Sequence, residues 1–288
     1  MRSLNIRSGT ARPRARFLAV CTAFAAVVMF VSTASAHDFW LIPHLFAFSD
    51  DSMVHVNGKS GVQFPKGAPV QPTRVASAWV IGANARTQIT QLAVVDSSLL
   101  LHHKPGASGQ YLIAVALTPR TSRSTPAGLL RYLRAEGGGA EATRLERENA
   151  LVGDSLVFHG ASYAATVVQV GRAGARAFSL TAGFPLEFVP LSDPAHLHVG
   201  DTLRVRVLGG GKAARGIGID ARNAADSVGT ENPWTTLNAD ANGVVHLALS
   251  KPGPWLIRSA WVGKRAGGAS NEWDVARSTY VFDVATRH

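Results

Sequence analysis

Residues 203–208 read Leu-Arg-Val-Arg-Val-Leu, and this stretch decides the fold class. Its apolar side chains alternate with Arg204 and Arg206, so an extended chain here has one apolar face and one charged face. A period of two is typical of a strand that packs against a core on one side only. The stretch therefore predicts a strand whose two arginines point to solvent.

Similar strand signals recur along the chain, between segments rich in Gly and Pro. Seven further segments are predicted as strands: Val54–Val56, Val75–Ile81, Tyr111–Leu117, Tyr163–Val170, Val244–Leu249, Trp255–Val262 and Thr279–Val284. Short strands at this spacing favour β-sandwiches over alternating βαβ units. We expect an all-β protein made of two β-sandwich-like domains.

One segment departs from the strand pattern. Leu129, Leu130 and Leu133 have helical spacing, and the glycines at 137–139 then interrupt it. We therefore expect a short helical insertion in the first domain, within Pro126–Ala150.

Prolines at 185, 190 and 194 suggest a boundary between two domains. We expect an N-terminal β-rich domain over residues 37–187 and an immunoglobulin- or transthyretin-like β-sandwich over residues 188–288. Turn signals before Val244 and around Pro252 further predict a hairpin in which His246 lies opposite Arg258.

The first 36 residues have the pattern of a signal peptide. Five arginines precede an apolar run at 17–31, and Ala34-Ser35-Ala36 is a cleavage signature that places the cut before His37. An uncleaved membrane anchor is the alternative, but a spanning helix needs about 20 apolar residues. We expect a periplasmic or secreted protein that does not span the membrane after cleavage.

The charge and the cysteine content exclude some functions. The formal net charge is +10, and removal of the five arginines in residues 1–36 leaves +5. The remaining basic residues are scattered, so we interpret them as solvated and expect no nucleic-acid partner. Cys21 is the only cysteine and lies in the signal peptide. The mature chain can then form no disulfide and offers no thiolate to a metal.

The mature chain shows none of the common enzyme motifs, but its first residue is informative. After cleavage, His37 would carry a free α-amino group and an imidazole, which together can chelate one metal ion. Such nitrogen ligands suit Cu(II), Ni(II) or Zn(II). The alternative is that His37 is merely the residue that cleavage leaves behind.

Other histidines offer supporting ligands. His196 and His198 flank one residue of an extended segment, so both can point to one face and share an ion. A solvated edge before Gly200 is the more ordinary interpretation. His102 and His103 are adjacent and would point in opposite directions if they lie on a strand, and we assign no function to His44 or His55.

Several motifs of this chain, in this order, resemble those of one protein family. They are His37–Pro43 directly after the signal peptide, Gly183–Pro190, Gly200–Leu203, Asp240–Gly243, Pro252–Arg258 and Ser278–Phe282. The chain resembles the DUF4198 family, periplasmic proteins often labelled nickel or cobalt uptake components and similar to NikM. The resemblance implies a transthyretin-like second half and a metal-binding role with His37 as a ligand. It also implies one departure, because family members often carry a histidine where this chain has Trp261.

These observations together predict an exported accessory protein that is not an enzyme. It would bind a divalent transition metal (Ni, Co, Cu or Zn) or a small complex of one at His37, and pass it to a membrane transporter or an outer-membrane receptor. One alternative is a copper-dependent oxidase with an N-terminal histidine brace, which needs a second histidine beside His37. The other is an envelope interaction module that binds no metal.

Overall fold

The computed structural model of the protein describes residues 37–172, 174–226 and 234–287. The expected signal peptide, residues 1–36, and Cys21 within it lie outside these ranges. Within them the protein is mostly β-structure, with three sheets and two short α-helices. This confirms the expected fold class.

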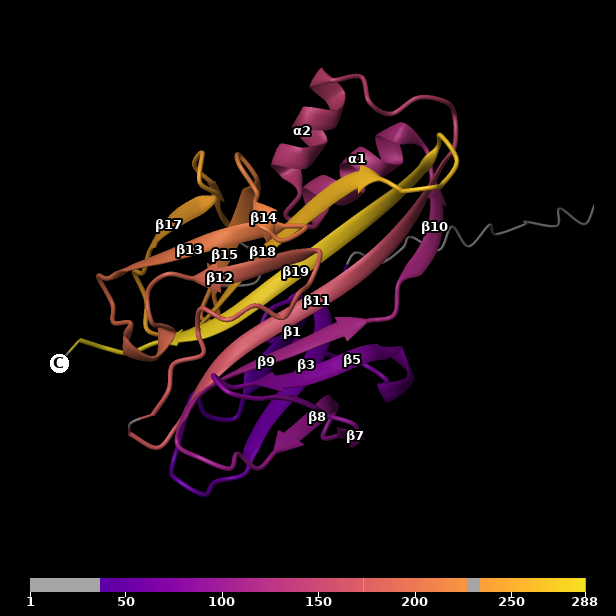
Figure 1. Cartoon of the computed structure of the whole chain (residues 1–288). Helices are drawn as coiled ribbons and strands as arrows, with labels where there is room; N and C mark the ends of the chain where they lie inside the picture. Colours follow the sequence, from indigo (N-terminus) through magenta and orange to yellow (C-terminus); the bar gives the residue numbers. More distant parts are fainter. Residues whose placement is uncertain (1–36, 173, 227–233, 288) are drawn as a thin grey trace, which may run out of the picture. The chain divides into compact units, whose positions relative to one another are not determined.

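The largest sheet contains strands from both the first and the last parts of the described chain, from β2 to β19 (Figure 1). Its main strand order is β16-β15-β18-β19-β11-β9-β5-β6, and β10 and β2 also pair with β11. These strands are β2 (Ala47–Phe48), β5 (Val75–Ile81), β6 (Arg86–Gln88), β9 (Gly109–Leu117), β10 (Arg120–Ser124), β11 (Leu156–Val170), β15 (Gly218–Asn223), β16 (Thr235–Asn238), β18 (Gly253–Lys264) and β19 (Glu272–Val284).

Two smaller sheets accompany it. One has the order β1-β3-β8-β7 with β4 paired to β3, and the other has the order β12-β13-β14 with β17 paired to β13. The first comprises β1 (Asp38–Pro43), β3 (Val54–Gln63), β4 (Lys66–Pro69), β7 (Leu92–Val95) and β8 (Ser98–His103). The second comprises β12 (Leu186–Pro190), β13 (Thr202–Gly209), β14 (Lys212–Ala213) and β17 (Val244–Ala248).

Strand β9 shows how the three sheets are layered. All six residues from Leu112 to Leu117 are buried. Leu112, Ala114 and Ala116 belong to one core with residues of β12, β13 and β17, whereas the residues between them belong to another core with residues of β1, β3 and β8. Because neighbouring side chains on a strand point to opposite faces, the two small sheets cover opposite faces of the large one.

Seven of the eight predicted strand segments lie within strands of the structure, and the eighth, Val244–Leu249, extends one residue beyond β17. In β13 the expected alternation is also present: Leu203, Val205 and Val207 are fully buried, whereas Arg204 and Arg206 are exposed. Local hydrophobic periodicity was therefore sufficient to find these strands.

The expected hairpin between β17 and β18 is wrong. Strand β17 pairs with β13, where His246 lies opposite Arg204, and β18 pairs with β15 and β19 instead. The chain between β17 and β18 thus crosses from one sheet to another. Both strands bury a face in the same core, and this non-local packing outweighs the short connection between them.

Strands from both sides of the expected domain boundary meet in the large sheet. Strand β11 pairs in parallel with β19 from Val157↔Glu272 to Thr166↔Val281. The position between residues 187 and 188 lies inside β12. The division into domains 37–187 and 188–288 stays a prediction about folding units.

The expected helical insertion is confirmed as α1 (Pro126–Ala135) and α2 (Gly139–Arg147). The Thr125 side chain caps α1 by accepting a hydrogen bond from the amide of Gly128. Leu129 and Leu133 are fully buried in a core shared with Ala260 and other residues of β18 and β19. Among the described residues, neither helix has the length and apolar character of a membrane span.

Candidate functional site at His37

Strand β1 places His37 against the large sheet. It pairs antiparallel with β3, from Asp38↔Gly61 to Pro43↔Val56. Its side chains are buried on both faces, because Phe39 joins the core under the first small sheet while Trp40 packs with Phe64. The residue after the expected cleavage site is therefore the start of a buried strand.

A buried ionic cluster holds Asp38. The Arg258 guanidinium lies 2.9 Å from the carboxylate of Asp38 and 3.1 Å from that of Asp220. It also stacks over the ring of Trp234 at 3.9 Å. Buried charges are costly unless they are paired, so this geometry keeps Asp38, and with it the adjacent His37, in place.

Arg277 of β19 contacts His37 directly. Its guanidinium donates hydrogen bonds to the Glu136 carboxylate at 2.6 Å, to the Ser162 hydroxyl at 2.6 Å and to the main-chain carbonyl of His37 at 3.4 Å. It also lies 5.6 Å from the ring centre of Tyr132. One partly buried cation thus joins the large sheet, the helical insertion and the start of β1.

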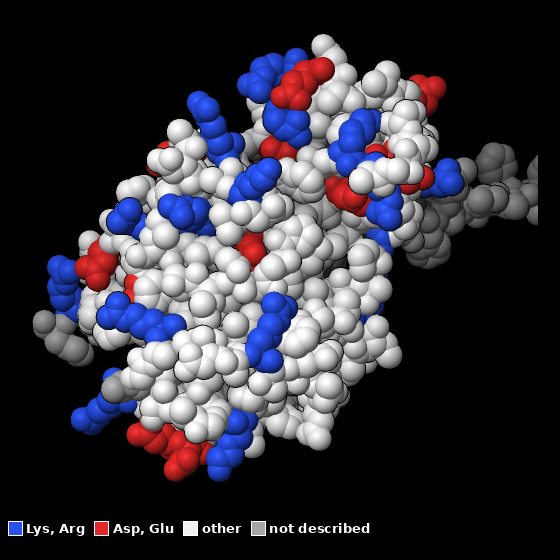
Figure 2. Space-filling view, in the orientation of Figure 1, with Lys and Arg blue, Asp and Glu red and all other residues white. Residues whose placement is uncertain are grey.

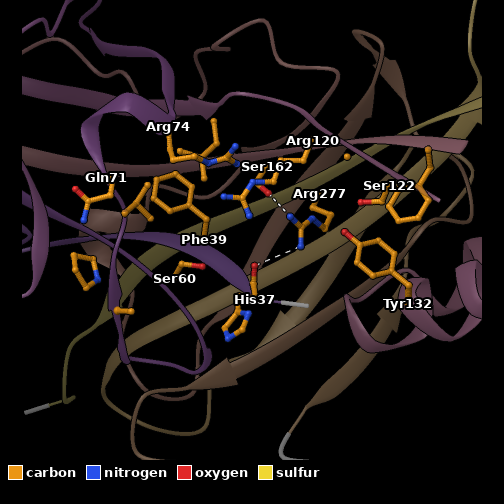
Figure 3. Close-up of a pocket in the computed structure, with 16 residues that line it drawn as sticks. His37, Phe39, Ser60, Gln71, Arg74, Arg120, Ser122, Tyr132, Ser162 and Arg277 are labelled. Carbon is orange, nitrogen blue, oxygen red and sulfur yellow. Dashed lines mark hydrogen bonds between the residues drawn. The ribbon is translucent and has the colours of Figure 1, made fainter. Parts of the chain in front are cut away.

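His37 and Arg277 line a pocket of about 430 Å³ (Figure 3). Its walls come from β1, β3, β4, β9, β10, β11, β19, α1 and the 3₁₀ turn η1 (Pro72–Arg74). In Figure 3 the carbonyl of His37 faces Arg277, and its imidazole lies on the other side of the backbone. The pocket therefore has its arginines on one side of His37 and the imidazole on the other.

The pocket is strongly cationic. Besides Arg277 it is lined by Arg74 of η1 and Arg120 of β10. In the described part of the chain, no carboxylate lies within ion-pair distance of Arg74 or Arg120. Partial burial lowers the pKa of Arg74, and the positive charges of Arg120 and Arg277 lower it further. Only Arg277 has its charge compensated, by Glu136.

The proposed supporting ligands lie elsewhere. His196 ends the 3₁₀ turn η2 (Pro194–His196), where its ring lies 3.3 Å from the carboxylate of Asp193. The ring of His198 contacts the main-chain carbonyl of His196 at 3.1 Å. Neither histidine lines the pocket of His37. The structure thus brings His196 and His198 near each other but does not add them to this pocket.

Trp261 also lies outside the pocket. It packs against the core between the large sheet and the sheet of β13, whereas its neighbours Ala260 and Val262 face the helical insertion. Arg258, two residues before Ala260, is on that latter face with Asp38. A side chain at position 261 therefore points away from the face of the sheet on which β1 begins.

Sequence reasoning missed a group of three histidines on the first small sheet. His55 of β3 is the register partner of His102 of β8, and His44 follows β1. Ring centres are 5.7 Å apart for His44 and His55, and 6.4 Å apart for His55 and His102. Even so, residues 37–172, 174–226 and 234–287 contain no group of three or more His, Asp or Glu side chains placed to hold a metal ion.

A sequence model of DUF4198, described as a domain of unknown function, matches residues 34–263. The chain belongs to the DUF4198 family. This confirms the resemblance inferred from the motifs after His37. No curated protein matches this DUF4198 chain.

Three solved structures show a distant likeness to this DUF4198 protein. A mutant alpha-2-macroglobulin of Salmonella has a TM-score of 0.24 and 11% identity, covering 85% of this chain but 15% of its own. The D0-D1 domain of intimin has a TM-score of 0.21 and 11% identity, covering 86% of this chain and 98% of its own. The FN1-FN3 domains of chicken CNTN1 have a TM-score of 0.22 and 8% identity, covering 84% and 65%.

Proposed function

We propose that this DUF4198 protein is an exported accessory protein that captures a transition-metal cargo at His37 and supports its uptake across the envelope. One observation carries the proposal: the residue expected to begin the mature chain lines a pocket of about 430 Å³. Cleavage before His37 would place an amine and an imidazole on one residue at this pocket. A nickel or cobalt uptake role of the NikM kind belongs to the same proposal.

The charge of the pocket limits the form of the cargo. His37 offers at most two nitrogen ligands, and three guanidinium groups line the same pocket. A bare divalent cation is repelled by such a surface, whereas a metal that carries anionic ligands of its own is not. We therefore propose that the cargo is a small anionic complex of Ni, Co, Cu or Zn, with His37 supplying nitrogen ligands.

Calorimetric titration of the exported protein with Ni(II), Co(II), Cu(II) and Zn(II), each supplied as its anionic citrate complex and compared with the free ion, tests this proposal. All chains should carry Gln at positions 44, 55 and 102, so that metal binding to the histidine group does not add to the signal. His37→Ala and a one-residue extension before His37 should each weaken binding by at least about tenfold, because each removes one nitrogen of the chelate. Affinity should also fall as pH falls, since protons compete for both nitrogens.

Two further variants sharpen the titration. His246→Ala is the matched control and should leave metal affinity unchanged, because His246 lies on β17 opposite Arg204. Replacing His196 and His198 together tests whether they contribute from outside the pocket. Equal affinity of the unaltered N-terminus, the extended form and His37→Ala would contradict the proposal, and an envelope interaction module would then be the better hypothesis.

The copper-oxidase alternative requires a second histidine ligand. A histidine brace needs a second histidine beside the first, and His37 is the one histidine among the described residues that line the pocket. Oxygen consumption by the copper-loaded protein in the presence of a reductant would support this alternative.

A further inference from the structure

The arginines of the pocket do not themselves ligate a metal ion, because a guanidinium group stays protonated and has no lone pair to offer. Arg74 and Arg120 come from η1 and β10, and Arg277 comes from β19. Three like charges around one cavity repel one another, and proteins rarely hold such a group without a counter-charge. Figure 3 shows the three side chains on the same side of the His37 backbone.

The partners of the three guanidinium groups differ. The guanidinium of Arg277 already donates hydrogen bonds to Glu136, to Ser162 and to the carbonyl of His37. In contrast, the side chains of Arg74 and Arg120 make no hydrogen bond or ion pair within the described ranges. Two guanidinium groups therefore remain available, each able to hold a carboxylate through two parallel hydrogen bonds.

The other residues that line the pocket favour an organic ligand over an inorganic one. Phe39, Leu117 and Phe158 contribute apolar surface, and the hydroxyls of Ser60 and Ser122 and the amide of Gln71 contribute hydrogen-bonding groups. A pocket of about 430 Å³ has the size of small-molecule sites, and its mixture of apolar walls with a few polar groups is typical of them. Inorganic phosphate would leave the apolar walls without a partner.

We propose that Arg74 and Arg120 bind a small organic anion with two or more carboxylates, with Arg277 completing the cationic wall. One carboxylate would pair with each free guanidinium, and the carbon skeleton would lie against Phe39 and Phe158. Binding of this anion does not require metal at His37, so the inference goes beyond the proposed function. The imidazole of His37 lies on the other side of the backbone from the three arginines, so the anion and the imidazole are tested separately.

Metal-free exported protein, titrated calorimetrically with tricarballylate, succinate, propionate and inorganic phosphate, tests the inference. Tricarballylate and succinate should bind with a Kd below about 1 mM, and propionate should bind at least about tenfold more weakly because it has one carboxylate. Arg74→Gln and Arg120→Gln should each lower the affinity for tricarballylate at least about tenfold.

The control is Arg204→Gln, which removes an exposed arginine of β13 that does not line the pocket. This variant should bind tricarballylate as the unaltered protein does, and Arg120→Gln should keep the fold because Arg120 is exposed. Binding of tricarballylate that neither arginine substitution weakens, or no binding of either polycarboxylate, would overturn the inference. Tighter binding of phosphate than of succinate would overturn the assignment to carboxylates.

His37→Ala separates this inference from the proposed function. The variant should still bind tricarballylate while it loses metal. Loss of metal binding with anion binding retained supports both proposals. Loss of tricarballylate binding in His37→Ala would contradict an anion site formed by Arg74 and Arg120.

Discussion

The guanidinium of Arg277 lies 2.6 Å from the carboxylate of Glu136, whose side chain is only 1% exposed. Glu136 ends α1, and Arg277 lies in the middle of β19. The same guanidinium donates to the carbonyl of His37. This pair therefore links the helical insertion and the start of β1 to the large sheet.

Glu136→Gln should destabilise the protein by about 3 kcal/mol, because it leaves the partly buried charge of Arg277 without its counter-charge. Urea denaturation measures the change in the free energy of unfolding. The control is Glu146→Gln, which breaks the ion pair with Arg134 in the same helical insertion. Both side chains of that pair are 45% exposed, so the control should cost less than about 1 kcal/mol. Equal effects of the two substitutions would contradict the structural role of the buried pair.

Asp38→Asn should increase local opening of β1. Arg258 would lose one of its two buried carboxylates, at a cost of about 3 kcal/mol. Hydrogen exchange should show faster exchange of the β1 amides than in the unaltered protein. Asp274→Asn, which breaks an exposed pair with Arg265, should leave this exchange unchanged. Unchanged protection of β1 in Asp38→Asn would argue against the anchoring role of the pair.

His55 should titrate below its ordinary pKa of 6.5, because burial lowers the pKa and the neighbouring His44 and His102 lower it further. His44→Gln or His102→Gln should raise the pKa of His55 towards 6.5, as measured by NMR titration of the ring protons. A pKa at or above 6.5 in the unaltered protein would contradict the arrangement of the three rings.

The same depressed pKa has a consequence for stability. Well above pH 6.5 the ring of His55 is neutral in both the folded and the unfolded chain, so it does not make stability depend on pH there. As the pH falls through 6.5, the unfolded chain takes up the proton first, and the folded state loses stability. His55→Gln should reduce this acid sensitivity in thermal unfolding between about pH 7 and pH 5.

The exported protein should begin at His37. Intact mass of the protein recovered from the periplasm or the medium decides this, because each additional residue before His37 shifts the mass by a known amount. A chain that retains even one residue from 1–36 has no free amine on His37. Such a chain would keep the pocket of Figure 3 but lose the proposed chelate.

Local pattern was sufficient for eight of the strands, for the helical insertion and for one residue of the site, but it missed other strands such as β8 and β15. The alternation around Arg204 and Arg206 identified β13, and the leucine spacing after Pro126 identified α1. Both signals act within one element, where neighbouring side chains are placed by the backbone alone. His37 was found in the same local way, from the cleavage signature before it.

Tertiary structure decided which strands pair and which side chains meet. The parallel pairing of β11 with β19 and the partner of β17 depend on packing between distant segments, and the short connection after β17 suggested the wrong partner. Arg74, Arg120 and Arg277 reach one pocket from far apart in the sequence, where each had been interpreted as one more solvated positive charge. The position of a residue along a strand determines which face of the sheet its side chain is on. Whether that face meets solvent, a carboxylate or a shared cavity depends on how the sheets pack.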